Sequence, residues 1–186
     1  MDQNKLKRKF VQGNKKAFGV VYDKYCDAMF NVCLRYTRNH DEAADILQDA
    51  FLRVYQKRQL FNLEYELGAW IKRIVIHEAI NHFRAKKMQF VDEGEPHFVE
   101  EVEIAVDFEE EKLDFKDLIL DILREMPDGY RTIFNLYVFE NLKHQEIAEY
   151  LNVSVSTSKT QLFKARKMIQ DRLEELKITR ERIING

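Results

Sequence analysis

Glycine and proline are scarce in this sequence, with 6 and 2 among 186 residues. Because these residues form the turns between short strands, their scarcity argues against a loop-rich β architecture. No apolar run approaches the roughly 18 residues of a membrane-spanning helix, and the basic N-terminus lacks a secretory signal pattern. We therefore expect an all-α, cytoplasmic protein without direct membrane insertion, long enough for one large or two small helical domains.

Cysteine is equally scarce, and no Cys-x-x-Cys pair occurs. Cys26 and Cys33 share one face of a predicted helix, so we expect reduced core thiols and neither a disulfide nor a metal site. His77, Glu78 and His82 approach a zinc-peptidase motif, but these histidines point about 140° away from each other on a helix. Because no nucleophilic triad, phosphate-binding glycine loop or carboxylate pair occurs either, the sequence predicts no catalysis, no cofactor and no small-molecule substrate.

The formal net charge of −2 hides an uneven distribution of charged residues. Residues 88–128 contain 15 acids and 3 bases, a net charge of −12, whereas the remainder contains 17 acids and 27 bases, a net charge of +10. This asymmetry predicts basic modules joined by an acidic connector, which weakens non-specific DNA binding by the isolated protein.

Residues 144–168 have the pattern of a helix-turn-helix. Asn152 follows a short helix with an apolar stripe and tolerates a left-handed turn. Ser154 or Ser156 can then cap a second helix. The protein-facing side of that helix is predicted to contain Val155, Ser158, Leu162, Ala165, Ile169, Leu173 and Leu176.

The opposite face of this second helix carries hydroxyl groups near its start and cations behind them. It comprises Thr157, Thr160, Lys164 and Lys167, flanked by Gln161 and Phe163, and no acid lies between Ser154 and Gln170. Such a face suits phosphates and base edges in a DNA major groove, although a solvated surface helix can have the same pattern.

Three helices are predicted in the first 60 residues. A short opening helix contains Leu6 and Phe10, Asn14 can cap a long helix that ends near residue 36, and residues 39–41 form the next break and cap. The third helix has a buried stripe of Ala43, Leu47, Ala50, Phe51 and Val54. Its other face is rich in carboxylates around the exposed Leu52, and periodicity does not decide whether it is solvated or docks a basic partner helix.

A predicted loop at residues 57–66 precedes a helix with one polar stripe. Trp70, Arg73, His77, Asn81 and Arg84 step by three or four residues along one face. An aromatic ring followed by cations and amide or imidazole groups suits stacking on unpaired bases, although an ordinary exposed face can also have this composition. Residues 86–111 lack a helical period and are predicted to be a linker, followed by a helix at 113–126, a turn at 127–129 and a further packed helix.

Two separate blocks resemble the extracytoplasmic-function (ECF) sigma factors. Residues 41–51, Phe61, residues 68–74 and Phe83-Arg84 resemble sigma region 2, whereas residues 123–127, 146–148, 157–159 and 164–166 resemble sigma region 4. The resemblance implies a region 2 bundle at 1–87, an acidic linker at 88–112, a region 4 helix-turn-helix at 113–178 and a tail at 179–186.

The resemblance also implies partners and a role for each surface. The chain would bind the clamp helices and flap of core RNA polymerase, promoter DNA and an anti-sigma factor, while the polymerase performs the chemistry. Polymerase binding is assigned to Asp45, Gln48, Asp49, Leu52 and Arg53. Binding of the minus-10 DNA is assigned to Phe61, Asn62, Tyr65, Trp70, Arg73, His77, Asn81 and Arg84. The minus-35 DNA is assigned to Ser156, Thr157, Lys159, Thr160, Gln161, Phe163, Lys164 and Lys167.

Some residues depart from the family pattern. His77 replaces a usual asparagine and Asn81 a frequent aspartate, which leaves the preferred minus-10 base open. Lys143 replaces a usual serine cap, Asn152 a turn glycine and Ser158 a frequent valine. Each residue still suits its local geometry, so the predicted fold is unaffected.

Two alternatives to a sigma factor are a conventional helix-turn-helix regulator and a helical adaptor without a nucleic-acid role. Residues 41–51 and the stripe that begins at Trp70 favour the sigma factor. A simple repressor needs neither a polymerase-docking surface nor a strand-melting face.

Overall fold

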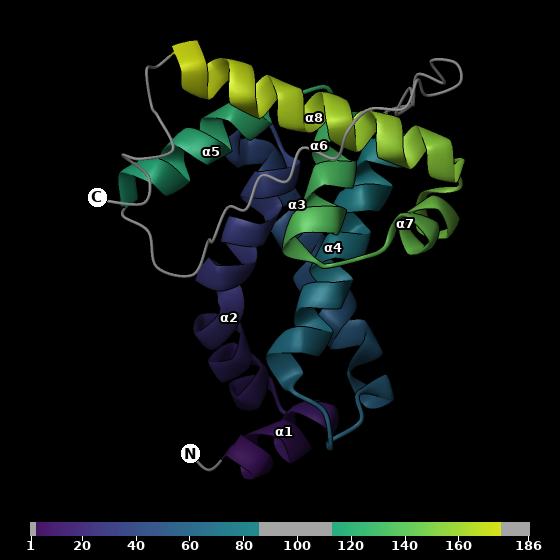
Figure 1. The fold of residues 1–186 in the computed structure, drawn as a ribbon. Helices are drawn as coiled ribbons and strands as arrows, with labels where there is room; N and C mark the ends of the chain where they lie inside the picture. The colour runs from purple at the N-terminus through teal and green to yellow at the C-terminus, as the bar shows by residue number, and fades with distance from the viewer. Residues whose placement is uncertain (1–2, 86–112, 176–186) are drawn as a thin grey trace. The chain divides into compact units, whose positions relative to one another are not determined.

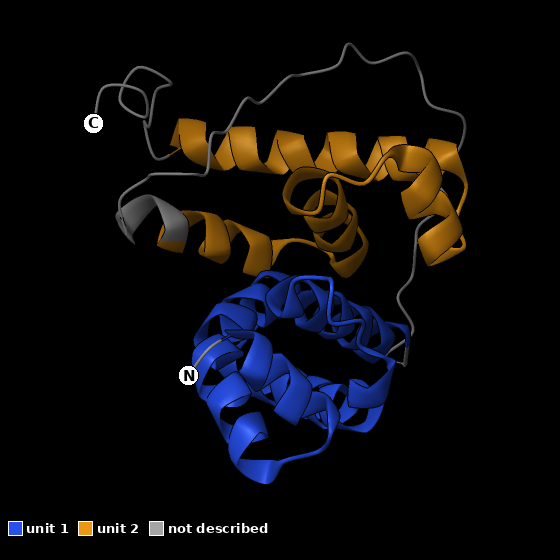
Figure 2. Cartoon of the chain, turned by 90° about the horizontal axis from the view of Figure 1, so that it is seen from below, with its two compact units in different colours: residues 1–87 blue, residues 88–186 orange. Residues whose placement is uncertain are grey.

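The computed structural model describes residues 3–85 and 113–175, and every regular element in these ranges is helical (Figure 1). The chain divides into two compact units, residues 1–87 and 88–186 (Figure 2). The prediction of an all-α fold with two helical domains is confirmed. The predicted linker at 88–112 and tail at 179–186 lie outside the described residues. None of the described helices is long and apolar enough to span a bilayer.

The first unit contains α1 (Gln3–Val11), α2 (Lys15–Tyr36), α3 (His40–Lys57), the short 3-10 helix η1 (Arg58–Leu60) and α4 (Leu67–Ala85). Helices α2, α3 and α4 pack against one another, and α1 packs against α2. The predicted loop at 57–66 is partly helical, because α3 ends at Lys57 and η1 follows directly. The irregular part of this segment is loop 61–66.

Side chains cap α2 and α3 at the predicted positions. The Asn14 side-chain oxygen accepts a hydrogen bond from the Ala17 amide at 3.0 Å, and that of Asn39 accepts one from the Glu42 amide at 2.8 Å. These bonds satisfy amides that have no partner within a helix, and they fix where each helix begins.

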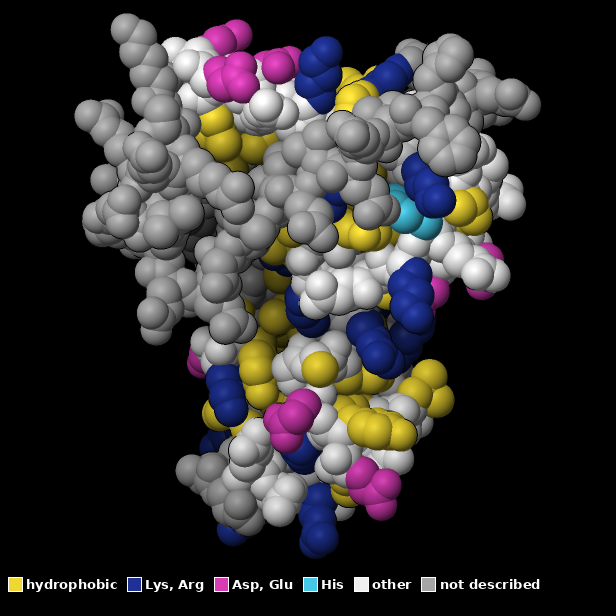
Figure 3. All heavy atoms as spheres, viewed as in Figure 1, with side chains coloured by type: hydrophobic (Ala, Val, Ile, Leu, Met, Phe, Trp, Pro, Cys, Tyr) yellow, Lys and Arg dark blue, Asp and Glu magenta, His cyan; other side chains and the backbone are white. Residues whose placement is uncertain are grey.

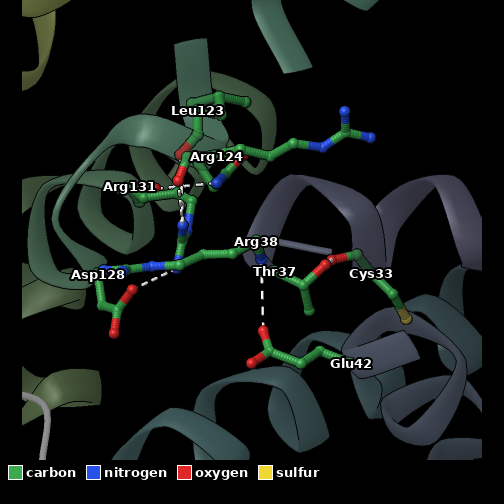
Figure 4. A network of polar contacts seen from close by, with 9 residues as sticks. Cys33, Thr37, Arg38, Glu42, Leu123, Arg124, Asp128 and Arg131 are labelled. Carbon is green, nitrogen blue, oxygen red and sulfur yellow. Dashed lines mark hydrogen bonds and ion pairs between the residues drawn. The ribbon is translucent and has the colours of Figure 1, made fainter. Parts of the chain in front are cut away.

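The buried residues of α3 confirm its predicted stripe, which the structure extends by Ile46. The prediction of two core thiols is right for Cys33, which is fully buried, and wrong for Cys26, which is only partly buried. The two residues share a face of α2, but its packing partners do not cover that face equally along its length. The Thr37 hydroxyl donates to the Cys33 carbonyl at 3.0 Å near the end of this helix (Figure 4).

The second unit contains α5 (Leu113–Glu125), α6 (Asp128–Phe134), the π-helix η2 (Asn135–Phe139), α7 (His144–Leu151) and α8 (Val155–Glu175). Helix α8 packs against α5, α6 and α7. The predicted turn at 127–129 is wrong, since α6 begins at Asp128. Pro127 is the N-cap residue of α6, and its carbonyl accepts a hydrogen bond from the Arg131 amide at 3.0 Å, so a helix begins directly after the proline.

A buried arginine joins the end of α5 to the start of α6 (Figure 4). The Arg131 guanidinium pairs with the Asp128 carboxylate and donates to the carbonyls of Leu123 at 3.3 Å and Arg124 at 3.4 Å. Its side chain is fully buried. Because the last carbonyls of a helix lack partners within the helix, this guanidinium both stabilises the end of α5 and fixes the turn after it.

Replacing Arg131 by methionine is expected to lower the free energy of unfolding by about 3 kcal/mol, since Asp128 and the two carbonyls would lose a buried partner. Urea denaturation followed by circular dichroism measures the change. Arg124→Met is the control, because Arg124 pairs with the exposed Asp121, and its expected cost is below about 1 kcal/mol. Equal costs for the two variants would contradict the role of Arg131.

The buried Cys33 thiol is expected to be unreactive in the native protein, because burial raises its pKa from 9.0 to about 12. The neutral thiol is favoured in the folded chain, so its contribution to stability is complete below pH 9 and is lost as the pH rises toward about 12. Mass-spectrometric mapping of iodoacetamide labelling at pH 8 should find Cys33 modified only after denaturation. Native labelling of Cys33 at the rate of an exposed thiol would contradict its burial.

Candidate nucleic-acid interface

The start of α8 is held by a serine cap. The Ser154 hydroxyl oxygen accepts a hydrogen bond from the Thr157 amide at 2.9 Å and lies 2.7 Å from the hydroxyls of both Ser156 and Thr157. Of the two predicted caps, Ser154 is therefore the one used. Thr157 takes part in this cap and is buried, whereas Ser156 is exposed.

The predicted minus-35 residues divide by exposure along α8. Ser156, Lys159 and Lys167 are exposed, Thr160, Phe163 and Lys164 are partly buried, and Thr157 and Gln161 are buried. The Gln161 side chain is 2% exposed, and neither of its amide atoms has a hydrogen-bond partner among the described residues. On the inner face, Ser158, Leu162, Ala165 and Ile169 are buried as predicted, but Val155 is 41% exposed and Leu176 lies outside the described residues.

The turn between α7 and α8 has the predicted left-handed residue. Asn152 has φ 56° and ψ 51°, and its amide donates to the Ala148 carbonyl. The amide of Val153 donates to the same carbonyl at 3.0 Å. At the other end of α7 the Glu146 carboxylate accepts the Lys143 amide at 2.7 Å, which provides a cap although Lys143 is not a serine.

A polar contact that the sequence did not predict joins the two helices. The Nδ1 atom of His144 lies 2.9 Å from the Ser158 hydroxyl oxygen, and its ring stacks on Tyr137 at 4.8 Å. The Arg166 guanidinium lies over the same tyrosine ring, 5.4 Å from its centre. Ser158 is thus a buried hydrogen-bonding residue that helps to set the orientation of α8 relative to α7.

The predicted polar stripe on α4 forms one continuous face. The Asn81 amide nitrogen lies 2.9 Å from Nδ1 of His77, one helical turn away. Arg73, His77 and Arg84 are exposed, whereas Trp70 and Asn81 are partly buried. The Glu78 carboxylate lies 3.6 Å from Arg53 on α3 and 3.7 Å from His77, so it connects the two helices beside this face.

An aromatic cluster lies at the start of α4. The Trp70 ring centre is 5.3 Å from that of Phe61 and 6.3 Å from that of Phe10 on α1. Phe61 is only 4% exposed, so it packs inside the unit in this structure. Loop 61–66 instead exposes Asn62 and Tyr65, the latter by 67%.

An exposed apolar surface at the end of η1 and in loop 61–66 was not predicted from the sequence. Leu60 is 78% exposed and Leu63 is 39% exposed. Figure 3 shows apolar side chains next to lysine and arginine side chains on one face of the first unit. The irregular spacing of the loop hides this surface from periodicity, but apolar residues with no helical partner could have indicated it.

The outer face of α3 is a separate surface. Asp45, Gln48, Asp49, Leu52 and Arg53 are exposed, and Leu52 alone presents a large apolar side chain at 55% exposure on this helix. Carboxylates around one exposed leucine can contact a basic partner through both charge and apolar area. The exposure of this face is as predicted.

Known proteins match this arrangement in both units. The family model of sigma-70 region 2 matches residues 21–88, and that of sigma-70 region 4 matches residues 116–169. The ECF RNA polymerase sigma factor SigW of Bacillus subtilis (strain 168) is 30% identical over 174 residues, which cover 89% of this chain and 93% of SigW. The ECF RNA polymerase sigma-E factor of Haemophilus influenzae is 25% identical, and the match covers 92% of this chain and 95% of the sigma-E factor.

Solved structures share the fold. The sigma factor RpoE of Bartonella quintana, in complex with the anti-sigma factor NepR, gives a TM-score of 0.51 at 22% identity over 86% of this chain and 98% of that one. CnrH in complex with the cytosolic domain of CnrY gives a TM-score of 0.50 at 16% identity, and the match covers 92% of this chain and 97% of CnrH. A helix-turn-helix unit and a region 2 bundle define the class as sigma factors. The chain belongs to the ECF group of the sigma-70 family, which confirms the resemblance found in its sequence.

Proposed function

We propose that the two units of this ECF sigma factor divide promoter recognition between them while the chain is bound to core RNA polymerase. Helix α8 recognises the minus-35 duplex, and α4 with loop 61–66 holds the melted minus-10 strand. The outer face of α3 docks on the polymerase. The observation that carries this assignment is that the chain has both a capped start of α8, with no acid between Ser154 and Gln170, and a separate stripe of aromatic, cationic and amide groups on α4.

The minus-35 assignment rests on the geometry of α8. A helix N-terminus carries partial positive charge, and Lys159, Lys164 and Lys167 extend this charge along the helix, so phosphates and base edges can bind there. The Gln161 amide has no hydrogen-bond partner among the described residues, and a base edge would supply one once the side chain turns outward. Thr157 acts by holding the cap rather than by direct contact.

The minus-10 assignment rests on groups that bind unpaired bases. Tyr65 offers an exposed ring for stacking, and Arg73 and Arg84 offer cations for the backbone. His77 and Asn81 already contact each other, so we propose that they contact a base as a pair. Phe61 and Trp70 support this face from within, through the aromatic cluster that contains both rings.

The polymerase assignment rests on α3. The exposed carboxylates of Asp45 and Asp49 flank Leu52, and Gln48 and Arg53 complete the face. We assign its partner as the clamp helices of core polymerase and assign the flap to the region 4 unit. Because the polymerase carries the catalytic centre for RNA synthesis, this chain needs no catalytic residue.

An anti-sigma factor is a further proposed partner. Two of the solved structures that share the fold are complexes, one with the anti-sigma factor NepR and one with the cytosolic domain of CnrY. A partner of that kind would keep the DNA-binding surfaces from the promoter until a signal releases them. A regulator that acts without polymerase is disfavoured, because it would have no use for the region 2 unit.

Run-off transcription with core polymerase and a library of genomic fragments tests this function. Sequencing of the RNA 5′ ends should identify start sites that depend on this chain and share two sequence elements upstream. Duplex binding by the isolated protein without any chain-dependent transcript would support a conventional regulator instead. If the protein neither binds duplex DNA nor produces chain-dependent transcripts, the helical adaptor without a nucleic-acid role is the remaining alternative.

Lys159→Ala is expected to weaken binding of the holoenzyme to a promoter recovered in that experiment. If the exposed ammonium contacts one phosphate, the slope of log affinity against log salt concentration should become shallower by about 0.9. Filter binding at several salt concentrations measures the slope. Lys16→Ala, at an exposed lysine of α2, is the control with the same change in charge. If the slope for Lys159→Ala equals that of wild type, Lys159 does not contact a phosphate.

Asp49→Arg is expected to reduce affinity for core polymerase by about tenfold or more, because a charge reversal opposes a basic partner. The helix content should be unchanged, since Asp49 is exposed in the middle of α3. Fluorescence anisotropy of labelled protein with core polymerase measures the affinity. Asp23→Arg on α2 is the matched control, and equal affinities of the two variants would refute the docking face.

A further inference from the structure

We propose that Lys7 is a positioning residue for minus-10 recognition, which holds loop 61–66 in the conformation that exposes Asn62 and Tyr65. This inference rests on the function proposed above for the loop. It extends that function to α1, which contains none of the residues assigned to DNA or polymerase. Lys7 itself lies inside the unit and touches the loop from behind.

The contact is a short hydrogen bond to the loop backbone. The Lys7 ammonium donates to the Tyr65 carbonyl at 2.7 Å and lies 3.7 Å from a carboxylate oxygen of Glu66. The Lys7 side chain is 7% exposed, whereas that of Glu66 is 73% exposed. Because an exposed carboxylate contributes little to an ion pair, the bond to the carbonyl is the main interaction.

The packing of α1 alone does not account for a lysine at this position. Leu6 and Phe10 are the buried neighbours of Lys7 on α1, and an apolar side chain would pack beside them without a desolvation cost. Burial of an ammonium group costs free energy unless it is paired. Among the described residues, the contacts that offset this cost are those with residues 65 and 66, so the lysine stabilises the loop.

Helix α1 supports both ends of the loop. Phe10 lies one turn after Lys7 and contacts the aromatic cluster of Trp70 and Phe61, where the loop begins. Lys7 holds the carbonyl of Tyr65, where the loop ends.

The middle of the loop is a short turn that depends on these two ends. The Asn62 side-chain oxygen accepts the Glu64 amide at 3.0 Å, and the Asn62 carbonyl accepts the Tyr65 amide at 3.1 Å. With both ends held, the side chains of Asn62, Leu63 and Tyr65 face solvent. Loss of the Lys7 bond would release the end of the loop that carries the exposed tyrosine.

The test compares Lys7→Met with Lys9→Met in the full chain. Methionine keeps the length of the buried stem, and Lys9 is an exposed lysine of α1, so both variants lose one charge from the same helix. Holoenzymes are assembled on a promoter fragment recovered by run-off transcription, and permanganate reactivity of the minus-10 thymines measures strand opening. Hydrogen exchange of the peptide that spans residues 61–67 is measured on the free protein.

Lys7→Met should reduce strand opening about tenfold, the ratio that corresponds to a hydrogen bond from a charged group. Exchange in residues 61–67 should become faster, while affinity for core polymerase stays at the wild-type value. Lys9→Met should match wild type in all three measurements. Glu66→Gln removes only the exposed carboxylate, so strand opening by the holoenzyme with this variant should be within about twofold of the wild-type value.

Normal opening by Lys7→Met, or an equal loss in Lys9→Met, overturns the proposal. Should Lys7→Met fail to fold, Lys7→Gln replaces it, because its amide is one bond too short to reach the carbonyl and the same loss is expected. If wild-type holoenzyme selects no promoter, the proposed function fails, whereas unchanged exchange at residues 61–67 in Lys7→Met refutes the positioning role independently.

Discussion

The hydrogen-bonded turn between α7 and α8 is the constraint on which the proposed minus-35 recognition depends. Two successive amides, those of Asn152 and Val153, share the Ala148 carbonyl, and Ser154 then caps α8. A left-handed residue costs free energy, which asparagine tolerates better than most. Together these bonds fix the direction in which α8 leaves the turn, and therefore which of its side chains lie on the proposed minus-35 surface.

The same region holds α7 and α8 together through polar and aromatic contacts. Ser158 bonds to His144, and the stack of His144, Tyr137 and Arg166 continues this polar contact across η2 and α8. In the first unit the comparable role belongs to aromatic packing, where Trp70 lies between Phe10 and Phe61. In each unit the helix with the proposed nucleic-acid-binding groups thus has its start held by contacts with residues outside that helix.

The sequence was sufficient to predict the features that depend on the local spacing of residues. The caps at Asn14 and Asn39, the left-handed Asn152 and the buried stripe of α3 follow from residues within one or two helical turns. The start of α6 was misjudged because Pro127 and Gly129 favour a turn locally, whereas the Pro127 carbonyl and the buried Arg131 stabilise a helix there.

Contacts between distant residues could not be predicted in this way. Lys7 and Tyr65 are 58 residues apart, and His144 and Ser158 belong to different helices, so no period in the sequence relates them. Burial of Phe61, Thr157 and Gln161 likewise depends on tertiary packing, although their residue types suggested direct contact with DNA.

We propose above all that the two units contact two separate promoter elements at once. Site-directed hydroxyl-radical cleavage of promoter DNA tests it most directly, with an iron chelate attached to Ser156→Cys or Asn62→Cys in a Cys26→Ala chain within the holoenzyme. The account predicts cuts near minus-35 from position 156 and near minus-10 from position 62. Cuts in the same element from both positions, or cuts that do not depend on core polymerase, would contradict it.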